Sequence, residues 1–166
     1  MVNKYKTCPV SGLPPQKLPN NICIPILLNK LEEEIRKVIF KGYTIFQTGM
    51  AMETDIWAAE IILKLKTEFP YISLFCYQPC ETQVNRWIEN WREKYYKVLS
   101  QADDVICLQK HYSSECMKRR NYKMINCSSC LIAVYDNQSC GGTLNTINYA
   151  KKQRLNIVLI NPFDCL

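Results

Sequence analysis

The sequence predicts an α/β fold in which an open, mostly parallel sheet carries helices on both faces. Short apolar runs alternate along the chain with segments of ten or more residues in helical spacing, which is the pattern of βαβ units. Stretches rich in glycine and proline separate these segments. With 166 residues, of which 48% are hydrophobic and 22% charged, the chain is long enough to bury a core, and we expect one domain over residues 1–166.

The expected strands are short apolar runs bounded by turn residues. They cover residues 4–10, 43–48, 71–77, 103–108, 131–135 and 156–160. The expected helices carry apolar residues at intervals of three and four, and cover residues 22–40, 55–69, 87–99, 115–126 and 143–153. Gly42 and Pro70 end the first two helices. On the third helix, Trp87, Trp91 and Tyr95 share one face and are expected in the core, as is Trp57.

One strand-to-helix junction is a candidate anion site. It reads S-C-G-G-T-L-N-T-I-N-Y-A over residues 139–150. The absence of a Cβ at Gly141 and Gly142 lets the backbone approach a ligand, and the N–H groups of the following first helical turn attract anions such as phosphate. Thr143 is at a position where hydroxyls cap helices. A structural turn is the alternative.

Four further loops follow expected strands, at residues 11–17, 48–55, 78–83 and 109–114. In open parallel sheets, ligands bind beyond the carboxyl ends of the strands, so these loops should meet the glycine turn there. The residues expected to contact the ligand are Gly12, Thr48, Gly49, Met50, Ala51, Asp55, Glu81, Gln83, Arg119, Arg120, Asn121, Gly141, Gly142 and Thr143.

Each of these candidates has a structural alternative. The segment 49–51 offers backbone N–H groups or forms a tight turn. Asp55 binds a ribose hydroxyl or caps its helix. Of Arg119 and Arg120, one is expected to face solvent and the other to clamp phosphate with its guanidinium fork. Glu81 and Gln83 read a polar edge of the ligand or cap the next helix. No catalytic residue is assigned.

The charge and the hydropathy of the chain indicate which kinds of partner to expect. The net charge of +6 is scattered apart from residues 118–120, which suits a phosphorylated ligand and makes nucleic acid an unlikely main partner. No apolar run is long enough for a membrane span and no signal peptide is recognised, so we expect a cytoplasmic protein with no membrane partner.

The ten cysteines are expected to be reduced. Cys127 and Cys130 have C-x-x-C spacing, but the chain has one histidine and no second such pair, so we expect no metal and no cofactor.

Several stretches, taken together, resemble the YpsA-like branch of the SLOG superfamily. They are S-G-L-P-P-Q-K-L, T-G-M-A-M-E-T-D-I-W-A-A-E, P-C-E-T-Q, Y-Y-K-V-L-S-Q-A-D, C-M-K-R-R-N-Y-K-M and G-G-T-L-N-T-I-N-Y-A, within residues 7–160. The resemblance implies a Rossmann-like fold, a nucleotide-derived ligand and a possible homodimer. The superfamily is related to the Lonely-guy phosphoribohydrolases and to the DNA-processing protein DprA.

The chain departs from the pattern of these relatives at three places. Leu13 and Pro14 stand where similar members carry His-Arg of a Gly-His-Arg-Pro motif, and Glu53 stands where a glycine is common. Asn145 and Thr146 occupy the region of the Lonely-guy glutamate. Cleavage of an N-glycosidic bond passes through an oxocarbenium-like state that a carboxylate stabilises, which an amide cannot do.

We therefore expect a protein that binds a nucleotide-derived ligand carrying phosphate and ribose, as a sensor or regulatory module. The alternative is a hydrolase of a nucleotide N-glycosidic or phosphate bond. In that case Glu53, Asp55 or Glu81 would have to replace the missing glutamate. A second alternative, by analogy with DprA, is a DNA-associated protein. Fold analogy alone decides none of these.

Overall fold

The computed structural model, which describes residues 2–21 and 23–164, is a parallel sheet of six strands with five α-helices in alternation. The strands are β1 (Thr7–Gly12), β2 (Ile45–Thr48), β3 (Ser73–Gln78), β4 (Asp104–Cys107), β5 (Cys130–Val134) and β6 (Asn156–Ile160). The helices are α1 (Ile24–Phe40), α2 (Thr54–Leu65), α3 (Glu89–Gln101), α4 (Cys116–Asn126) and α5 (Gly142–Lys152). The predicted α/β fold is confirmed, and every strand pair is parallel.

The boundaries differ from the predicted ones at both the starts and the ends of elements. Helix α2 ends at Leu65 and a turn over residues 66–68 follows, so the predicted end at residue 69, stopped by Pro70, is wrong. The first predicted strand begins instead with a 3₁₀ turn, Lys4–Lys6, because the side chain of Asn3 accepts a hydrogen bond from the Tyr5 N–H. A second 3₁₀ turn, Pro15–Lys17, occupies the loop after β1. Helix α3 starts at Glu89 because Trp87 belongs to the preceding turn, where its N–H donates to the Val84 carbonyl. The predicted start of the first helix, residue 22, lies outside the described residues.

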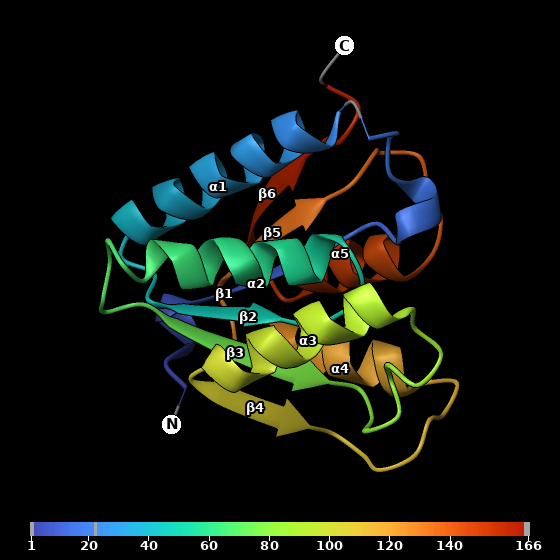
Figure 1. Ribbon diagram of the computed structural model, residues 1–166. Helices are drawn as coiled ribbons and strands as arrows, with labels where there is room; N and C mark the ends of the chain where they lie inside the picture. The colour runs from blue at the N-terminus through green and yellow to red at the C-terminus, as the bar shows by residue number, and fades with distance from the viewer. Residues whose placement is uncertain (1, 22, 165–166) are drawn as a thin grey trace.

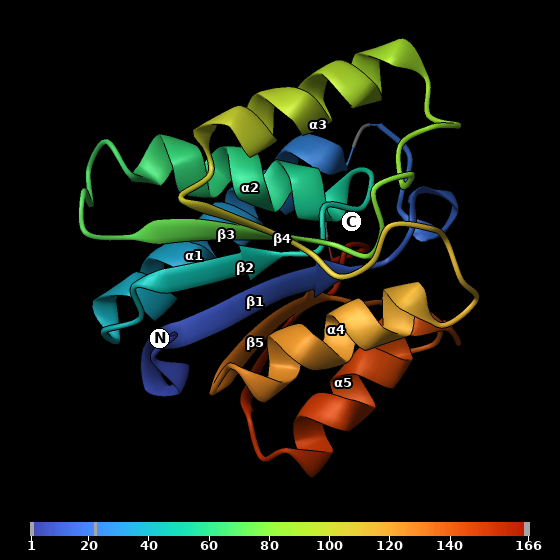
Figure 2. The ribbon, with the colours of Figure 1, turned by 90° about the horizontal axis from the view of Figure 1, so that it is seen from below.

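The strand order β4-β3-β2-β1-β5-β6 places the reversal of the chain between β1 and β5. The first four strands step outward in one direction, and α4 then returns the chain to the other side of β1. Figure 2 shows α1, α2 and α3 on one face of the sheet and α4 and α5 on the other. A crevice for a ligand is expected at such a reversal, beyond the carboxyl ends of the strands.

Strand β5 divides its side chains between two apolar clusters, one on each face of the sheet. Cys130, Ile132 and Val134 belong to the cluster under α1, α2 and α3, whereas Leu131 and Ala133 belong to the one under α4 and α5. All five residues of the strand are buried. A strand covered on both faces is apolar throughout, which explains the continuous apolar run in the sequence.

The aromatic face of α3 packs against the core, as predicted. Tyr95 is buried, and its ring meets that of Trp87 edge-on at 5.5 Å between centroids. Trp57 of α2 and Trp91 of α3 lie 6.2 Å apart and join the two helices. Trp57 is therefore a packing residue here and does not line the cleft at the strand ends.

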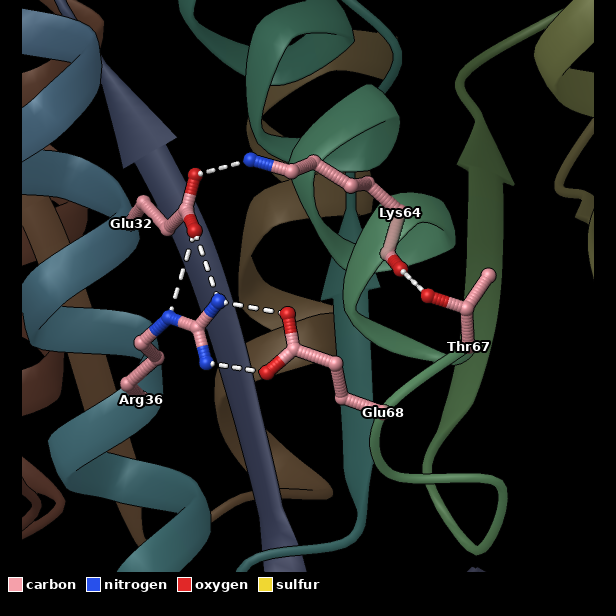
Figure 3. A network of polar contacts seen from close by, with 5 residues as sticks. All are labelled: Glu32, Arg36, Lys64, Thr67 and Glu68. Atoms are coloured by element: carbon pink, nitrogen blue, oxygen red, sulfur yellow. Dashed lines mark hydrogen bonds and ion pairs between the residues drawn. The ribbon is translucent and has the colours of Figure 1, made fainter.

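Charged side chains connect α1 to α2 on the outer surface (Figure 3). Arg36 donates two hydrogen bonds to the carboxylate of Glu68, at 2.7 and 2.8 Å. It also contacts Glu32 one turn earlier on α1, and Glu32 accepts a 2.9 Å bond from Lys64. Two carboxylates and two cations thus form one continuous network across the two helices.

The described residues contain no helix that is long and apolar enough to cross a membrane.

Candidate functional site

A cleft of about 330 Å³ opens at the carboxyl ends of the strands, at the reversal between β1 and β5. Eight of the fourteen predicted ligand residues line it: Gly12, Ala51, Asp55, Gln83, Arg120, Asn121, Gly142 and Thr143. A hollow of similar size, about 350 Å³, lies on the outer surface between α2 and α3, at Glu60 and Lys97. We take the strand-end cleft as the candidate site because parallel sheets bind ligands at this edge.

The glycine turn leads into α5 without a side-chain cap. Gly141 is the N-cap residue, with a φ of 128° that side chains rarely adopt, and no side chain caps the helix. A Cβ added at Gly142 would meet no atom within 4 Å, so the turn faces open space. The predicted cap, Thr143, is wrong: its hydroxyl donates a 2.8 Å hydrogen bond to the Gly12 carbonyl and ties α5 to β1.

Lys17 reaches the same turn from the loop after β1. Its ammonium donates a hydrogen bond to the carbonyl of Cys140 and would lie 3.7 Å from a Cβ at Gly141. The loop at residues 11–17 was expected to meet the glycine turn, but Lys17 itself was not among the predicted ligand residues. Its position in the loop does not show that its side chain points toward residue 140.

The loop after β2 is organised by Asp55. Helix α2 takes Glu53 as its N-cap residue, so the predicted capping role of Asp55 is wrong. Instead its carboxylate accepts the N–H of Ala51 at 3.2 Å, and that of Gly49 also hydrogen-bonds to it. Two backbone N–H groups that the sequence offers to a ligand are therefore directed at this carboxylate. The loop also holds Met50 and Glu53 at positive φ.

Arg120 is a buried clamp between three elements. Its Nη1 donates a 2.6 Å hydrogen bond to the Gly49 carbonyl, and its Nε and Nη2 donate to Oδ1 of Asn121 at 3.0 and 2.9 Å. The chain of bonds continues from Asn121 Nδ2 to the Thr146 hydroxyl, and from there to the Gly142 carbonyl. A continuous chain of hydrogen bonds thus joins the loop after β2, helix α4 and the glycine turn.

Burial sets the electrostatics of this cluster. It raises the pKa of the Asp55 carboxyl, and the positive charge of Arg120 and the two backbone N–H groups oppose that rise. Burial also lowers the pKa of the Arg120 guanidinium, opposed by the charge of Asp55. Asp55 is the single carboxylate among the described residues that line the cleft.

Gln83 presents an unusual acceptor at the edge of the cleft. Its Nε2 donates to the Met50 carbonyl at 3.1 Å, while its Oε1 is buried and has no hydrogen-bond partner among the described residues. Buried polar atoms without a partner are rare and call for an explanation. The predicted capping role of Gln83 and Glu81 is wrong, because Ile88 is the N-cap residue of α3 and no side chain caps that helix.

The other predicted ligand residues do not line the cleft. Thr48 and Met50 are buried, and the Thr48 hydroxyl bonds to the Met50 sulfur. Arg119 is exposed and bonds to the Gln109 side chain, and the N–H of Glu81 donates to the Gln109 carbonyl. As predicted, one arginine of the pair faces solvent. Gly49 is buried and its carbonyl accepts a hydrogen bond from Arg120, which lines the cleft. Gly141 is exposed and is the N-cap residue of α5.

Some residues line the cleft without having been predicted as ligand contacts. The largest are Trp87 and Met117, and the rest come mainly from the loops after β1 and β2: Ser11, Leu13, Pro14, Pro15, Met52 and Thr54. Trp87 was assigned to core packing on its helical spacing, and it packs against Tyr95 while still bordering the cleft. Residues with two roles of this kind are not distinguishable by periodicity.

No group of three or more His, Cys, Asp or Glu residues placed to hold a metal ion is found within residues 2–21 and 23–164. Cys130 of the C-x-x-C pair is buried beside Cys8 at the amino end of the sheet, opposite the cleft. Among the described residues, eight cysteines are free thiols, as expected: Cys8, Cys76, Cys80, Cys107, Cys116, Cys127, Cys130 and Cys140. Cys23 departs from the expectation, because it is disulfide-bonded.

Comparison with known proteins identifies the family. The model of the YpsA family, described as the YspA SLOG family, matches residues 19–165. The chain belongs to this family. It is 35% identical over 129 residues to a UPF0398 protein of Bacillus cereus strain B4264, and 34% identical over 125 residues to one of Bacillus thuringiensis strain Al Hakam. These alignments cover 76% and 74% of the chain, and 66% and 64% of the two relatives.

The matched region refines the resemblance recognised from the sequence. Five of the six quoted stretches lie within it, whereas S-G-L-P-P-Q-K-L at residues 11–18 precedes it. The loop that departs most from the family pattern is thus also the part outside the family match. This loop carries Leu13, Pro14 and Lys17, so its contribution to the site rests on the geometry of this chain alone.

Proposed function

We propose that the strand-end cleft of this SLOG-family protein binds a nucleotide-derived ligand through its phosphate and ribose, and that the protein acts as a sensor or regulatory module. The observation that carries the proposal is the uncapped start of α5 at Gly142, which faces open space in the cleft. Unpaired N–H groups and the helix dipole together favour a negative charge at such a position.

Two cations stand near this turn, and they differ in what they can offer. Arg120 uses three of its five N–H donors on Gly49 and Asn121 and is buried, so it is held in place and mainly supplies positive charge. Lys17 uses one of three ammonium donors on the Cys140 carbonyl, which leaves two for an incoming anion. We therefore assign to Lys17 the direct contact with phosphate.

Asp55 is the group suited to a ribose. One carboxylate oxygen, Oδ2, accepts the N–H of Ala51. The carboxylate also receives the Gly49 N–H, but its two oxygens retain lone pairs that can accept a hydroxyl hydrogen from a sugar in the cleft. A ribose hydroxyl is the usual partner of a carboxylate in dinucleotide sites. Phosphate at Gly142 and ribose at Asp55 would then place both halves of the ligand within the same lined space.

A hydrolase remains the second candidate, and the raised pKa of Asp55 is the observation that favours it. Catalytic acids and bases are often carboxylates whose pKa is raised by burial. Asn145 is exposed and does not line the cleft, so it supplies nothing in place of the glutamate of the Lonely-guy enzymes. Any hydrolysis of a nucleotide would therefore depend on Asp55.

One experiment separates these candidates. A thermal-shift screen against AMP, ADP, NAD and cyclic dinucleotides is run with chromatographic product analysis in the same wells. A ligand at 100 times its dissociation constant stabilises the protein by about 2.7 kcal/mol, which is readily visible. A shift without product supports the sensor. Product that disappears in Asp55→Asn supports the hydrolase, and the absence of any shift contradicts both.

A further inference from the structure

A second hollow adjoins the cleft and extends it along the protein surface. Its volume is about 570 Å³, and its lining includes Asn85, Arg86 and Tyr112. Gln83, Trp87 and Met117 line both spaces, so these three side chains form the border between them. A ligand anchored at the glycine turn can therefore continue past this border without leaving a lined surface.

The walls of the second hollow suit a flat aromatic ring. Trp87 is held rigidly, because its ring packs edge-on against the buried Tyr95. Tyr112 is 67% exposed and stands on a loop that Gln109 braces through bonds to the His111 carbonyl and the Ser113 hydroxyl. Aromatic side chains can stack on any of the nucleic-acid bases, because every base has a π face. Met117 adds a polarizable side chain that adapts to such rings.

Gln83 adds polarity at the border itself. Its amide is fixed by the bond from Nε2 to the Met50 carbonyl, and this bond leaves Oε1 buried without a donor. A ligand N–H or O–H that crosses the border would satisfy this acceptor. Among the buried side-chain oxygen and nitrogen atoms of the described residues, this oxygen is the one without a hydrogen-bond partner.

We propose that the second hollow is the base-binding compartment of the ligand site, with the base against Trp87 and Tyr112 and a donor of the ligand on Gln83 Oε1. The proposal rests on the proposed function and adds the ligand class, which is a nucleoside phosphate whose aromatic base contributes to affinity. Sugar phosphates without a base would occupy the cleft alone. Arg86 also lines the compartment, but stacking of the base does not require its charge.

The test compares two probes, AMP and ribose 5-phosphate, by isothermal titration calorimetry on the whole chain. We expect AMP to bind at least about tenfold more tightly, because stacking of one base on an aromatic side chain typically supplies that much. Tyr112→Ala, outside the phosphate cleft, should remove most of this advantage and leave the affinity for ribose 5-phosphate within about twofold. Trp87→Leu should lower the ratio of the two affinities. Gln83→Met removes the Oε1 acceptor together with the Nε2 bond to the Met50 carbonyl, and should weaken binding of AMP more than binding of ribose 5-phosphate.

Two controls keep the proposal falsifiable. Tyr71→Ala removes another exposed tyrosine, 58% accessible and outside the lining of both spaces, and should change neither affinity. Should Trp87→Leu fail to fold, Tyr112→Ala on its surface loop still tests the compartment. Equal affinities for the two probes, or an advantage of AMP that survives in the variants, overturns the base compartment while the phosphate site stands. Failure of both probes to bind contradicts the proposed function itself, and the base compartment falls with it.

Discussion

Arg120, a residue of α4, holds Gly49 of the loop after β2 in place. Its Nη1 donates a 2.6 Å hydrogen bond to the Gly49 carbonyl, and a Cβ at residue 49 would lie 2.6 Å from its Cζ and 2.9 Å from the Asp55 carboxylate. Such distances are far inside van der Waals contact. The absence of a side chain at Gly49 is therefore what allows a buried cation and a buried carboxylate to flank one backbone segment.

Gly49→Ala is expected to destabilise the protein by about 1–3 kcal/mol, as overpacking of a filled interior typically does. Urea unfolding measures this difference directly. Gly142→Ala is the matched control, because its Cβ would meet nothing within 4 Å, and its effect should stay within about 0.5 kcal/mol. Equal stabilities of the two variants would contradict the close packing around residue 49.

Gly142→Val is expected to abolish binding of the nucleotide ligand and to leave the fold nearly intact. The new branched side chain would project into the open space that the phosphate needs, and residue 142 has no positive φ to strain it. Calorimetric titration tests binding, and the circular dichroism spectrum tests the fold. Binding as tight as that of the unmodified chain would refute the anion site at the start of α5.

Lys17→Met is expected to lower the affinity for phosphate-containing ligands by about tenfold. One charge-assisted hydrogen bond typically contributes about 1.5–3 kcal/mol, and water that replaces the ammonium compensates for part of the loss. The substitution keeps much of the aliphatic stem and removes the ammonium. Lys41→Met serves as control, since Lys41 is exposed and follows α1 at the other end of the sheet. The two variants have the same net charge, so a similar loss in both would point to general electrostatics and against a contact by Lys17.

The fold could be predicted from the sequence because its signals are local. Periodicity of apolar residues distinguishes α1 from β5, and Gly42 and Pro70 interrupt the chain where the structure turns. Because the expected strands are parallel, the five loops at their carboxyl ends lie at one edge of the sheet. Gly12, Gly142 and Thr143 were therefore expected at one cleft, and the structure has them there. Alternation of strand and helix leaves few other arrangements.

The details of the site depend on rotation and on distant contacts, which local patterns do not encode. Adjacent arginines on a helix point about 100° apart, and only the packing of α4 decides that Arg120 is buried while Arg119 is exposed. Thr143 is at a helix start where caps are common, yet its hydroxyl bonds to the distant Gly12 carbonyl, whereas Asp55 bonds back to the loop that precedes its helix. The loop of Lys17 was expected at this edge of the sheet, but neither Lys17 nor Trp87 was predicted as a ligand contact.

The ion network between α1 and α2 should make stability depend on pH in a defined direction (Figure 3). Hydrogen bonds from Lys64 and then Arg36 lower the pKa of Glu32, and the bond from Arg36 lowers the pKa of Glu68. A carboxyl whose folded pKa is depressed stabilises the protein above its unfolded pKa, which is about 4.3 for glutamate, and this contribution is lost as the pH falls through the folded value.

Arg36→Met is therefore expected to lower the urea midpoint at pH 7, and the difference from the unmodified chain should shrink as the pH falls from about 5 to below 4. It should also shrink in 1 M salt, where the screening length is about 3 Å. Lys37→Met is the control, because among the described residues Lys37 forms its ion pair with Glu34 of the same helix and with no residue of a second helix. The guanidinium of Arg36 also lies 5.8 Å from the centre of the Phe69 ring. If the midpoint difference for Arg36→Met stays constant across pH and salt, the effect comes from packing against Phe69 and the ion network does not contribute.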